Sequence, residues 1–292
     1  MAYDNVILCL SKKKILNVYL KVLFIIPVLS LWIWAFIVEP HLMIEVDDVD
    51  VYLPKWERKL DGLKIVVAGD IHAAGYFYED WRIERIVDEI NAQNPDLVIM
   101  LGDYVNGAVY QSSYELAQFS KRLSNIKAPY GVYTILGNHD YLYGIEKIRK
   151  MLNKAGINIV ENSNVKITTN DGEFYIAGIA DAYEASYSFS EAMKGIPKGS
   201  SVIFLSHTPQ VFREIPKEVA IMISGHTHGG QVRLPLLGAV LSNTHERDKL
   251  ISGYYSIEGK HAYVSRGLGT SRVPIRFMCP PSITVMNVFS KK

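Results

Sequence analysis

The stretch LKIVVAGDIH, residues 63–72, combines two signals that decide the fold. Its first part is apolar except for Lys64, which is typical of a strand buried in a parallel sheet. The run ends in Gly-Asp-Ile-His, where glycine permits a sharp turn and the polar side chains offer carboxylate and imidazole groups. In open α/β sheets, ligands bind in the loops beyond the strand ends. The stretch therefore predicts an α/β sheet with a chemical site at its edge.

The same pattern recurs further along the chain. Apolar runs also end in Gly102-Asp103, Gly137-Asn138-His139-Asp140, Ser206-His207 and Gly225-His226-Thr227-His228. Five of the eight histidines of the chain fall in these loops. A lone histidine is most often an ordinary hydrogen-bonding residue, but chance does not explain this recurrence. The pattern predicts one shared site.

The rest of the chain after residue 62 alternates strand-like and helix-like stretches. Strands are predicted at residues 63–69, 96–101, 132–136, 174–180, 202–206 and 219–223, and helices at residues 81–94, 113–126 and 143–156. No internal repeat and no Pro/Gly-rich linker interrupts this region. We therefore expect one α/β domain over residues 63–292. Residues 39–62 are expected to form a linker that includes an edge strand, because residues 44–54 alternate apolar and acidic side chains.

The composition excludes several classes of protein. Of the 292 residues, 49% are hydrophobic and 21% are charged, whereas disordered chains combine low hydrophobicity with high net charge. Two cysteines are too few for a disulfide scaffold. The formal net charge of +1 provides no basic surface for a nucleic acid, so no nucleic-acid partner is expected.

Residues 22–38 (VLFIIPVLSLWIWAFIV) form an uncharged apolar run. As a helix this run spans ~26 Å, close to the ~30 Å hydrocarbon core of a membrane, and Lys21 can extend the span by snorkelling. A cleaved signal peptide and a buried soluble helix are the alternatives. No small-x-small cleavage motif follows Val38, however. The run predicts a single transmembrane anchor.

The charges that flank this run predict its orientation. Four lysines precede the run and five acidic residues follow it: Lys12, Lys13, Lys14 and Lys21, then Glu39, Glu45, Asp47, Asp48 and Asp50. The positive-inside rule then makes residues 1–21 a cytoplasmic basic tail. The domain that follows the anchor is accordingly expected outside the cytoplasm.

The polar residues at the strand ends offer imidazole, carboxylate and amide ligands without any thiolate. Zinc fingers and iron–sulfur clusters are therefore excluded, whereas mixed nitrogen and oxygen ligands suit Mn, Fe or Zn in a dinuclear site. Two such cations acidify a bound water and stabilise both oxygens of a displacement at phosphorus. The chain contains no GxSxG, Walker A or GxGxxG sequence that would favour a serine hydrolase or a nucleotide-dependent enzyme.

The blocks GDIH, GD, GNHD, SH and GHTH, in this order from Asp70 to His228, resemble the signature blocks of the calcineurin-like metallophosphoesterase superfamily. GHTHGGQVRLP and GLGTSRVPIRFMCPPSI resemble a subgroup of membrane-associated bacterial phosphoesterases related to UDP-2,3-diacylglucosamine pyrophosphatases. The resemblance covers residues 60–290. It implies a β-sandwich flanked by helices, two divalent metal ions, and hydrolysis of a phosphodiester or pyrophosphate by a metal-bridging hydroxide.

The resemblance also implies a role for individual residues. The first metal ion would be held by Asp70, His72 and His228, the second by Asn138, His207 and His226, and Asp103 would bridge them. His139 would face the substrate and stabilise phosphoryl charge or protonate the leaving group. Arg272 and Arg276 lie in the glycine-rich C-terminal stretch and are candidates for binding a substrate phosphate, with pairing to surface acids as the alternative.

The sequence departs from the family pattern at Asn106. Many members read GDxxD, with a second carboxylate that supports the catalytic histidine, whereas this chain reads GDYVN. An amide can orient an imidazole by hydrogen bonding but cannot stabilise an imidazolium by charge. His139 is then a weaker acid–base group, unless Asp140 or another residue replaces the missing carboxylate.

Three functions follow from these patterns. The favoured one is a membrane-anchored phosphoesterase that acts on a phosphodiester or pyrophosphate, including lipid-linked substrates such as UDP-2,3-diacylglucosamine. That particular substrate would lie at the cytoplasmic face, which conflicts with the predicted orientation, so an extracytoplasmic phosphodiester fits better. The alternatives are a non-catalytic, metal-stabilised membrane scaffold, which only Asn106 favours, and a secreted nuclease or cyclic-nucleotide phosphodiesterase, which would need a cleaved N-terminus.

Overall fold

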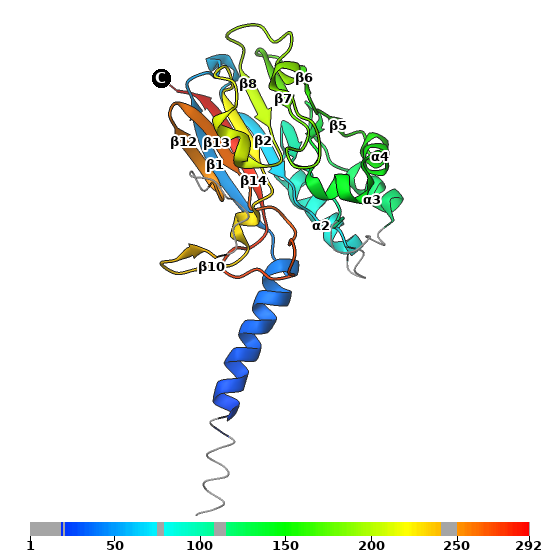
Figure 1. Ribbon diagram of the computed structural model, residues 1–292, viewed down its shortest axis with the longest axis vertical. Coiled ribbons are helices and arrows are strands. Elements are labelled where there is room, and N and C mark those ends of the chain that lie inside the picture. The colour runs from blue at the N-terminus through cyan, green and yellow to red at the C-terminus, as the bar shows by residue number, and fades with distance from the viewer. Residues whose placement is uncertain (1–18, 20, 75–78, 108–114, 241–249, 292) are drawn as a thin grey trace, which may run out of the picture.

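The computed structural model of the protein describes residues 19, 21–74, 79–107, 115–240 and 250–291. Their backbone forms two six-stranded sheets that pack face to face and are flanked by helices (Figure 1). This is the mixed α/β sandwich that the alternating sequence pattern predicts. The predicted basic tail, residues 1–21, lies almost wholly outside the described residues.

The first sheet has the strand order β1-β14-β2-β3-β4-β5. Its strands are β1 (Glu45–Leu53), β14 (Ser282–Ser290), β2 (Leu63–Ala68), β3 (Leu97–Met100), β4 (Val132–Thr134) and β5 (Asn158–Ile159). β2 to β5 run parallel, while β14 is antiparallel to β2 and parallel to β1. β1 is an edge strand, which confirms the prediction for residues 44–54.

The second sheet has the order β12-β13-β9-β8-β7-β6. Its strands are β12 (Gly253–Ile257), β13 (Lys260–Val264), β9 (Ile221–Ser224), β8 (Val202–Leu205), β7 (Glu173–Gly178) and β6 (Ser163–Thr168). The four central strands are parallel and the two edge strands antiparallel. A separate small hairpin pairs β10 (Arg233–Leu234) with β11 (Gly238–Ala239). All six strands predicted from apolar runs are therefore present.

Three helices cover the outer face of the first sheet: α2 (Glu79–Ala92), α3 (Leu116–Leu123) and α4 (Asn138–Lys154). The short elements are α5 (Phe189–Ala192) and the 3₁₀ turns η2 (Arg58–Leu60), η3 (Pro209–Arg213) and η4 (His228–Gly230). α4 begins at Asn138, earlier than the predicted start at residue 143, but it is kinked at Gly144, where φ is 129°. The turn before the kink is stabilised by the Asp140 carboxylate, which accepts the backbone N–H of the N-cap residue Gly137 at 3.0 Å.

β2 shows why the central strands are uninterrupted apolar runs. Ile65 and Val67 are buried in the core between the two sheets, whereas Val66 and Ala68 are buried in the core beneath the helices. Each face of the strand is covered, so both sets of alternating side chains are excluded from water.

The apolar helix predicted for residues 22–38 spans Lys21–Leu42, and its most apolar window has a mean hydropathy of 2.3. Its last part, η1 (Trp34–Leu42), is a π-helix. Only 11% of that window is buried, and the helix projects away from the sandwich (Figure 1). It is long and apolar enough to cross a membrane, which makes it a candidate membrane span.

Glu39 fastens the end of this helix to the domain. Its side chain is buried and accepts the backbone N–H groups of Met278 and Cys279 at 3.1 Å and 2.6 Å. The indole N–H of Trp34 donates to the same carboxylate at 2.8 Å. These three donors offset the cost of burying a carboxylate, so the helix end is held against the C-terminal loop.

The strand register shows which end of the sandwich carries the helix. Glu45, which begins β1 just after the helix, pairs with Ser282 at the start of β14. Thr284 of β14 pairs with Val67 near the end of β2. Because β3 and β4 run parallel to β2, the carboxyl ends of these strands all lie at the end of the sheet where the apolar helix joins.

Candidate metal centre

Loops that follow five strands converge on one cluster at this end of the sandwich. The predicted ligands are Asp70 and His72 after β2, Asp103 after β3, Asn138 after β4, His207 after β8, and His226 and His228 after β9. Most of them are buried, and only Asn138 and His226 are half-buried. The strand-end pattern therefore predicts which side chains the fold brings together.

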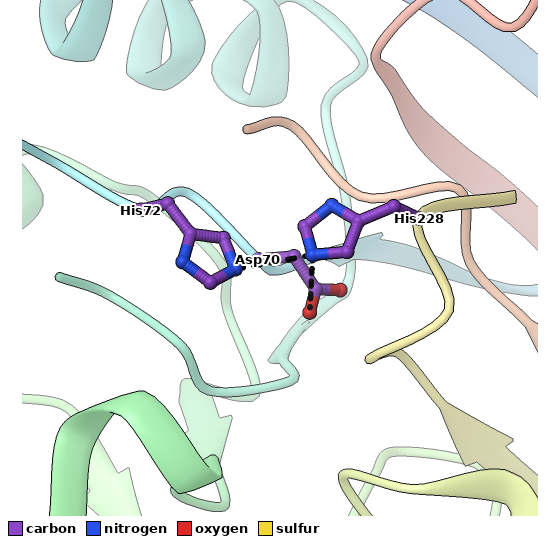
Figure 2. A group of neighbouring side chains, drawn as sticks. All are labelled: Asp70, His72 and His228. Carbon is purple, nitrogen blue, oxygen red and sulfur yellow. Dashed lines mark hydrogen bonds and ion pairs between the residues drawn. The ribbon is translucent and has the colours of Figure 1, made fainter. Parts of the chain in front are cut away.

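Asp70, His72 and His228 form the first group (Figure 2). Nε2 of His72 lies 3.1 Å from Nε2 of His228, which lies 3.9 Å from Oδ1 of Asp70. Nδ1 of His228 lies 3.3 Å from the carbonyl oxygen of Gly269. A proton on Nδ1 can be donated to that carbonyl, which leaves the Nε2 lone pair for a cation.

Asp103, His207 and His226 form the second group. Nε2 of His207 lies 3.3 Å from Oδ2 of Asp103 and 3.2 Å from Nδ1 of His226. Nδ1 of His207 lies 2.7 Å from the carbonyl oxygen of Leu101, the same arrangement that fixes the tautomer of His228. This group can also present nitrogen and oxygen lone pairs to one cation.

Asp103 lies between the two groups. Its Oδ2 is 3.4 Å from Nε2 of His72 on one side and 3.3 Å from Nε2 of His207 on the other. Its Oδ1 accepts the backbone N–H of His139 at 2.9 Å. This is where a carboxylate must lie if it is to bridge two cations.

Buried atoms without partners support a pair of cations at this site. The side-chain oxygen of Asn138 and the Nδ1 atoms of His72 and His139 are buried and accept or donate no hydrogen bond among the described residues. Such atoms are rare in folded proteins because burying them is costly. With nitrogen and oxygen donors from two adjoining groups, the residues present fit two divalent cations.

The pKa values of the histidines suit metal binding. Burial lowers the pKa of His72 and of His226 to about 3, and it lowers the pKa of His228 well below its ordinary value. Burial also opposes the charged form of His207, but the carboxylates of Asp103, Asp70 and Asp181 together outweigh it and raise the pKa of His207. Three imidazoles are thus neutral at pH 7, as ligands must be, and a cation would displace the proton of the fourth.

The backbone at the cluster is strained. Five of the seven predicted ligands have φ between 49° and 69°, in the left-handed region that non-glycine residues avoid: Asp70, His72, Asp103, His226 and His228. The surrounding structure must hold these conformations against their conformational cost. Their concentration at one cluster indicates a functional site.

Two glycines allow the loops to approach each other. A Cβ atom on Gly137 would collide with the Asp103 carboxylate, and one on Gly225 would collide with that of Asp70. The glycine that precedes Asn138 and the one that precedes His226 are therefore required by close packing.

His139 lies in the first turn of α4 beside the first group. Its ring meets the ring of His72 edge-on, with centroids 4.5 Å apart. Burial lowers the pKa of His139 below 6.5, so the imidazole is neutral at pH 7. The role of His139 toward a substrate stays a prediction.

Asn106 and Asp140 are the two candidates for supporting His139, and neither forms a hydrogen bond with the His139 side chain. The side-chain oxygen of Asn106 has no hydrogen-bond partner among the described residues. The Asp140 carboxylate instead accepts the backbone N–H groups of Asp103 and Tyr104 at 2.8 Å and 2.9 Å. Asp140 therefore fixes the loop that carries Asp103.

The two predicted substrate-binding arginines differ in position. Arg272 is exposed, and its charge adds to burial in lowering the pKa values of His139 and His226, so it lies near the cluster. Arg276 is fully buried and donates to the carbonyl oxygens of Cys279 and Gly269, at 2.8 Å and 2.6 Å. This position corrects the prediction for Arg276, because its guanidinium holds the C-terminal loop and is closed to a substrate.

Asp181 is a further acidic residue near the cluster, and it is not among the site residues predicted from the sequence. It is buried, and one carboxylate oxygen accepts the backbone N–H groups of Tyr183 and Glu184 at 3.0 Å and 2.9 Å. The other oxygen has no partner among the described residues, and the charge of Asp181 raises the pKa of His139 against the effect of burial. The available signal is its position directly after the predicted strand at residues 174–180.

The sequence of residues 63–230 matches the calcineurin-like phosphoesterase family. The chain is 30% identical over 262 residues to the uncharacterized metallophosphoesterase YkuE of Bacillus subtilis, covering 88% of this chain and 89% of that relative. It is also 29% identical over 232 residues to the phosphodiesterase YaeI of Escherichia coli, covering 77% and 82%.

A relative with a lipid substrate is also similar. The UDP-2,3-diacylglucosamine pyrophosphatase LpxG of Chlamydia muridarum is 28% identical over 316 residues, which cover 89% of this chain and 93% of that relative. The chain carries the nitrogen and oxygen donor set of a metal-dependent phosphoester hydrolase. It belongs to the calcineurin-like phosphoesterase family.

Proposed function

We propose that the protein is a membrane-anchored phosphoesterase that uses two divalent cations to hydrolyse a phosphodiester or pyrophosphate at the membrane surface. The observation that carries this proposal is that the candidate metal centre follows the carboxyl ends of β2, β3 and β4, at the end of the sheet where the apolar helix joins. Figure 1 shows this helix projecting away from the sandwich. A protein anchored in this way meets lipid-linked substrates at a high effective concentration.

Contacts near the cluster support this proximity. Pro40 and His41, at the end of the apolar helix, line the same small cavity as His72 and Arg82. The end of the candidate membrane span therefore lines the same cavity as a predicted metal ligand. A phosphate group attached to a lipid would need to travel little from the bilayer to reach the cluster.

The relatives support the reaction class and favour a lipid-linked substrate. One is named a phosphodiesterase and another a UDP-2,3-diacylglucosamine pyrophosphatase. The lysines before the span favour a cytoplasmic N-terminus and an extracytoplasmic domain. In that orientation an extracytoplasmic lipid phosphodiester is a better substrate than UDP-2,3-diacylglucosamine.

The roles of the side chains follow from their positions. The first group would hold one cation, and the second group together with Asn138 would hold the other, with Asp103 shared between them. Mn, Fe or Zn suits these nitrogen and oxygen donors. When bound, the cations would lower the pKa of a water and offset the negative charge of the phosphoryl group. His139 would donate a hydrogen bond to a phosphoryl oxygen or a proton to the leaving oxygen. Arg272 would pair with the phosphate.

His139→Gln is expected to lower kcat by about 10²- to 10⁴-fold while the bound metal is unchanged. If His139 protonates the leaving group, the loss is larger for an alkyl diester than for bis-p-nitrophenyl phosphate, whose leaving group needs no proton. Burial lowers the pKa of His139 from its ordinary value, so the wild-type rate on the alkyl diester falls as the pH rises through this lowered pKa. The variant lacks this pH dependence.

The matched control for this prediction is His261→Gln. His261 pairs with Tyr254 at the start of β13, at the opposite end of the sheet from the cluster, and is expected to retain activity. Equal losses in the two variants would assign His139 a structural role.

The proposed function is tested with the full chain in lipid nanodiscs. Phosphatidylglycerol and UDP-2,3-diacylglucosamine are supplied either in the same discs as the protein or in separate discs, with bis-p-nitrophenyl phosphate as a soluble substrate. We expect metal-dependent hydrolysis of a lipid substrate in shared discs only, and hydrolysis of the soluble diester in both arrangements. Equal rates in shared and separate discs would reject membrane presentation, and failure to hydrolyse every diester with metal bound would reject the reaction.

A further inference from the structure

We infer that the β10–β11 hairpin is a second membrane contact, whose apolar tip inserts into the interface of the same bilayer as the anchor. The inference rests on the proposed membrane anchoring and adds the orientation of the domain on the bilayer. It concerns a surface outside the metal centre.

The tip of the hairpin exposes large apolar side chains. Leu236 is completely exposed, Leu237 is 76% exposed and Val240 is 51% exposed. The turn is closed by the N–H of Leu237, which donates to the carbonyl oxygen of Leu234 at 3.2 Å. Turns that face water usually carry glycine, proline, asparagine, aspartate or serine, whereas this turn has three leucines beside its proline, Leu-Pro-Leu-Leu. In water these leucines incur a hydrophobic cost that insertion into lipid would remove.

Backbone pairing ties the hairpin to the end of the anchor. The N–H of Arg233 donates to the carbonyl oxygen of Phe277 at 2.9 Å. The next two residues, Met278 and Cys279, donate to the Glu39 carboxylate at the end of the apolar helix. Figure 1 shows the hairpin projecting sideways from the sandwich close to this end of the helix. The tip is therefore held near the level at which the anchor would leave the bilayer.

A tryptophan lies beside the anchor in the first turn of α2. Trp81 is 47% exposed, and the guanidinium of Arg85 lies 5.6 Å from the centre of its ring. Arg85 also donates to the carbonyl oxygen of Leu42, the last residue of the apolar helix, at 2.5 Å. In Figure 1, β10 and α2 lie on opposite sides of the helix end. Tryptophan and arginine are typical of the interface between lipid and water.

The chemistry of the tip favours lipid over a protein partner. Residues 234–240 contain no charged side chain, and Arg233 lies at the base of the hairpin, as in a loop that enters an interface and leaves a cation at the headgroups. The tip presents few side chains, whereas a stable protein–protein interface needs roughly 800 Å² from each partner. The candidate membrane span next to it supplies the bilayer.

The test uses a fluorescent nitrobenzoxadiazole probe on single cysteines in the full chain, reconstituted in phosphatidylcholine nanodiscs. The probe sites are Leu236→Cys in the hairpin, Leu31→Cys in the apolar helix and Asp171→Cys as the control, each with Cys9→Ser. The native Cys279 is buried and stays unlabelled. Asp171 is exposed and shares a surface depression with Leu63, at the start of β2 and so opposite the anchor. Hydrolysis of a soluble diester verifies that each variant is folded.

Quenching by lipids that carry a nitroxide either near the headgroup or at the middle of the acyl chain separates the outcomes. We expect the mid-chain nitroxide to quench the probe at Leu31, which lies midway along the Lys21–Leu42 span, the headgroup nitroxide to quench the probe at Leu236, and neither to quench the probe at Asp171. Quenching at Leu31 without quenching at Leu236 overturns the hairpin contact and leaves the anchor intact. If the Leu236 emission is blue-shifted but unquenched, protein covers the hairpin, which also overturns the inference. No quenching at Leu31 overturns the proposed anchor and the hairpin contact together.

Discussion

Replacement of Asp103 by asparagine is expected to lower diester hydrolysis at least about 100-fold and to reduce the metal bound by the protein. Changes to residues behind metal ligands already cost about 10–100-fold, and Asp103 is predicted to contact both cations directly. Its Oδ2 lies 3.4 Å from Nε2 of His72 and 3.3 Å from Nε2 of His207. An amide nitrogen at this position has no lone pair to share and no negative charge.

The measurement is kcat/KM for bis-p-nitrophenyl phosphate together with metal content after gel filtration. Asp171→Asn is the matched control, because it makes the same change at an exposed position at the opposite end of the sandwich. A variant at Asp103 with wild-type metal content and turnover would show that this carboxylate bridges nothing.

Replacement of Gly137 by alanine is expected to cost about 100-fold in activity, since a displacement of about 1 Å in a catalytic group has effects of this size. The added methyl group would collide with the Asp103 carboxylate and with the His207 ring. Gly137 has φ of −105°, which alanine adopts without strain. The loss of activity therefore reports only the displacement of the Asp103 and His207 side chains.

Gly172→Ala is the matched control for this prediction. Its new methyl group would meet the flexible end of Lys59 at 3.2 Å and the side chain of Leu60 at 3.3 Å, far from the cluster. We expect wild-type activity in this variant and a wild-type Tm within a few degrees. Full activity in Gly137→Ala would mean that the loops around Asp103 move freely, which contradicts a rigid centre.

The strands could be predicted from the sequence because of how they are buried. β2 is covered on both faces, so its apolar run is unbroken and ends at the turn that carries Asp70 and His72. The start of α4 could not be predicted in the same way. It depends on the Asp140 carboxylate, which accepts backbone N–H groups from its own helix and from the loop of Asp103, a contact between distant segments.

The residues of the candidate site could be predicted where a polar side chain follows an apolar strand, usually after a glycine, and less well elsewhere. Asp181 also follows a strand, but Ala180 precedes it where most other loops have glycine, so the pattern is weaker there. Arg276 was mispredicted because sequence does not separate a buried guanidinium from an exposed one. Its partners are main-chain carbonyls, including those of Gly269 and Cys279. Every residue type has a main-chain carbonyl, so such partners cannot be recognised in the sequence.

The apolar helix is also longer than hydropathy alone predicts. It continues past Glu39 and Pro40 to Leu42, although a carboxylate and a proline usually end such a run. The carboxylate is tolerated because Met278 and Cys279 donate to it from the C-terminal loop. That loop lies more than two hundred residues away in the sequence, so a local pattern cannot reveal it.

The central claim, a dinuclear metal centre that hydrolyses phosphoesters, is tested most directly by removing and restoring the metal. The full chain is stripped with a chelator, and turnover of bis-p-nitrophenyl phosphate is followed while Mn²⁺ is added and bound metal is counted. We predict no turnover in the stripped protein and recovery that is complete when two ions are bound per chain. Turnover that persists without metal, or two bound ions without turnover of any phosphoester, would contradict the account.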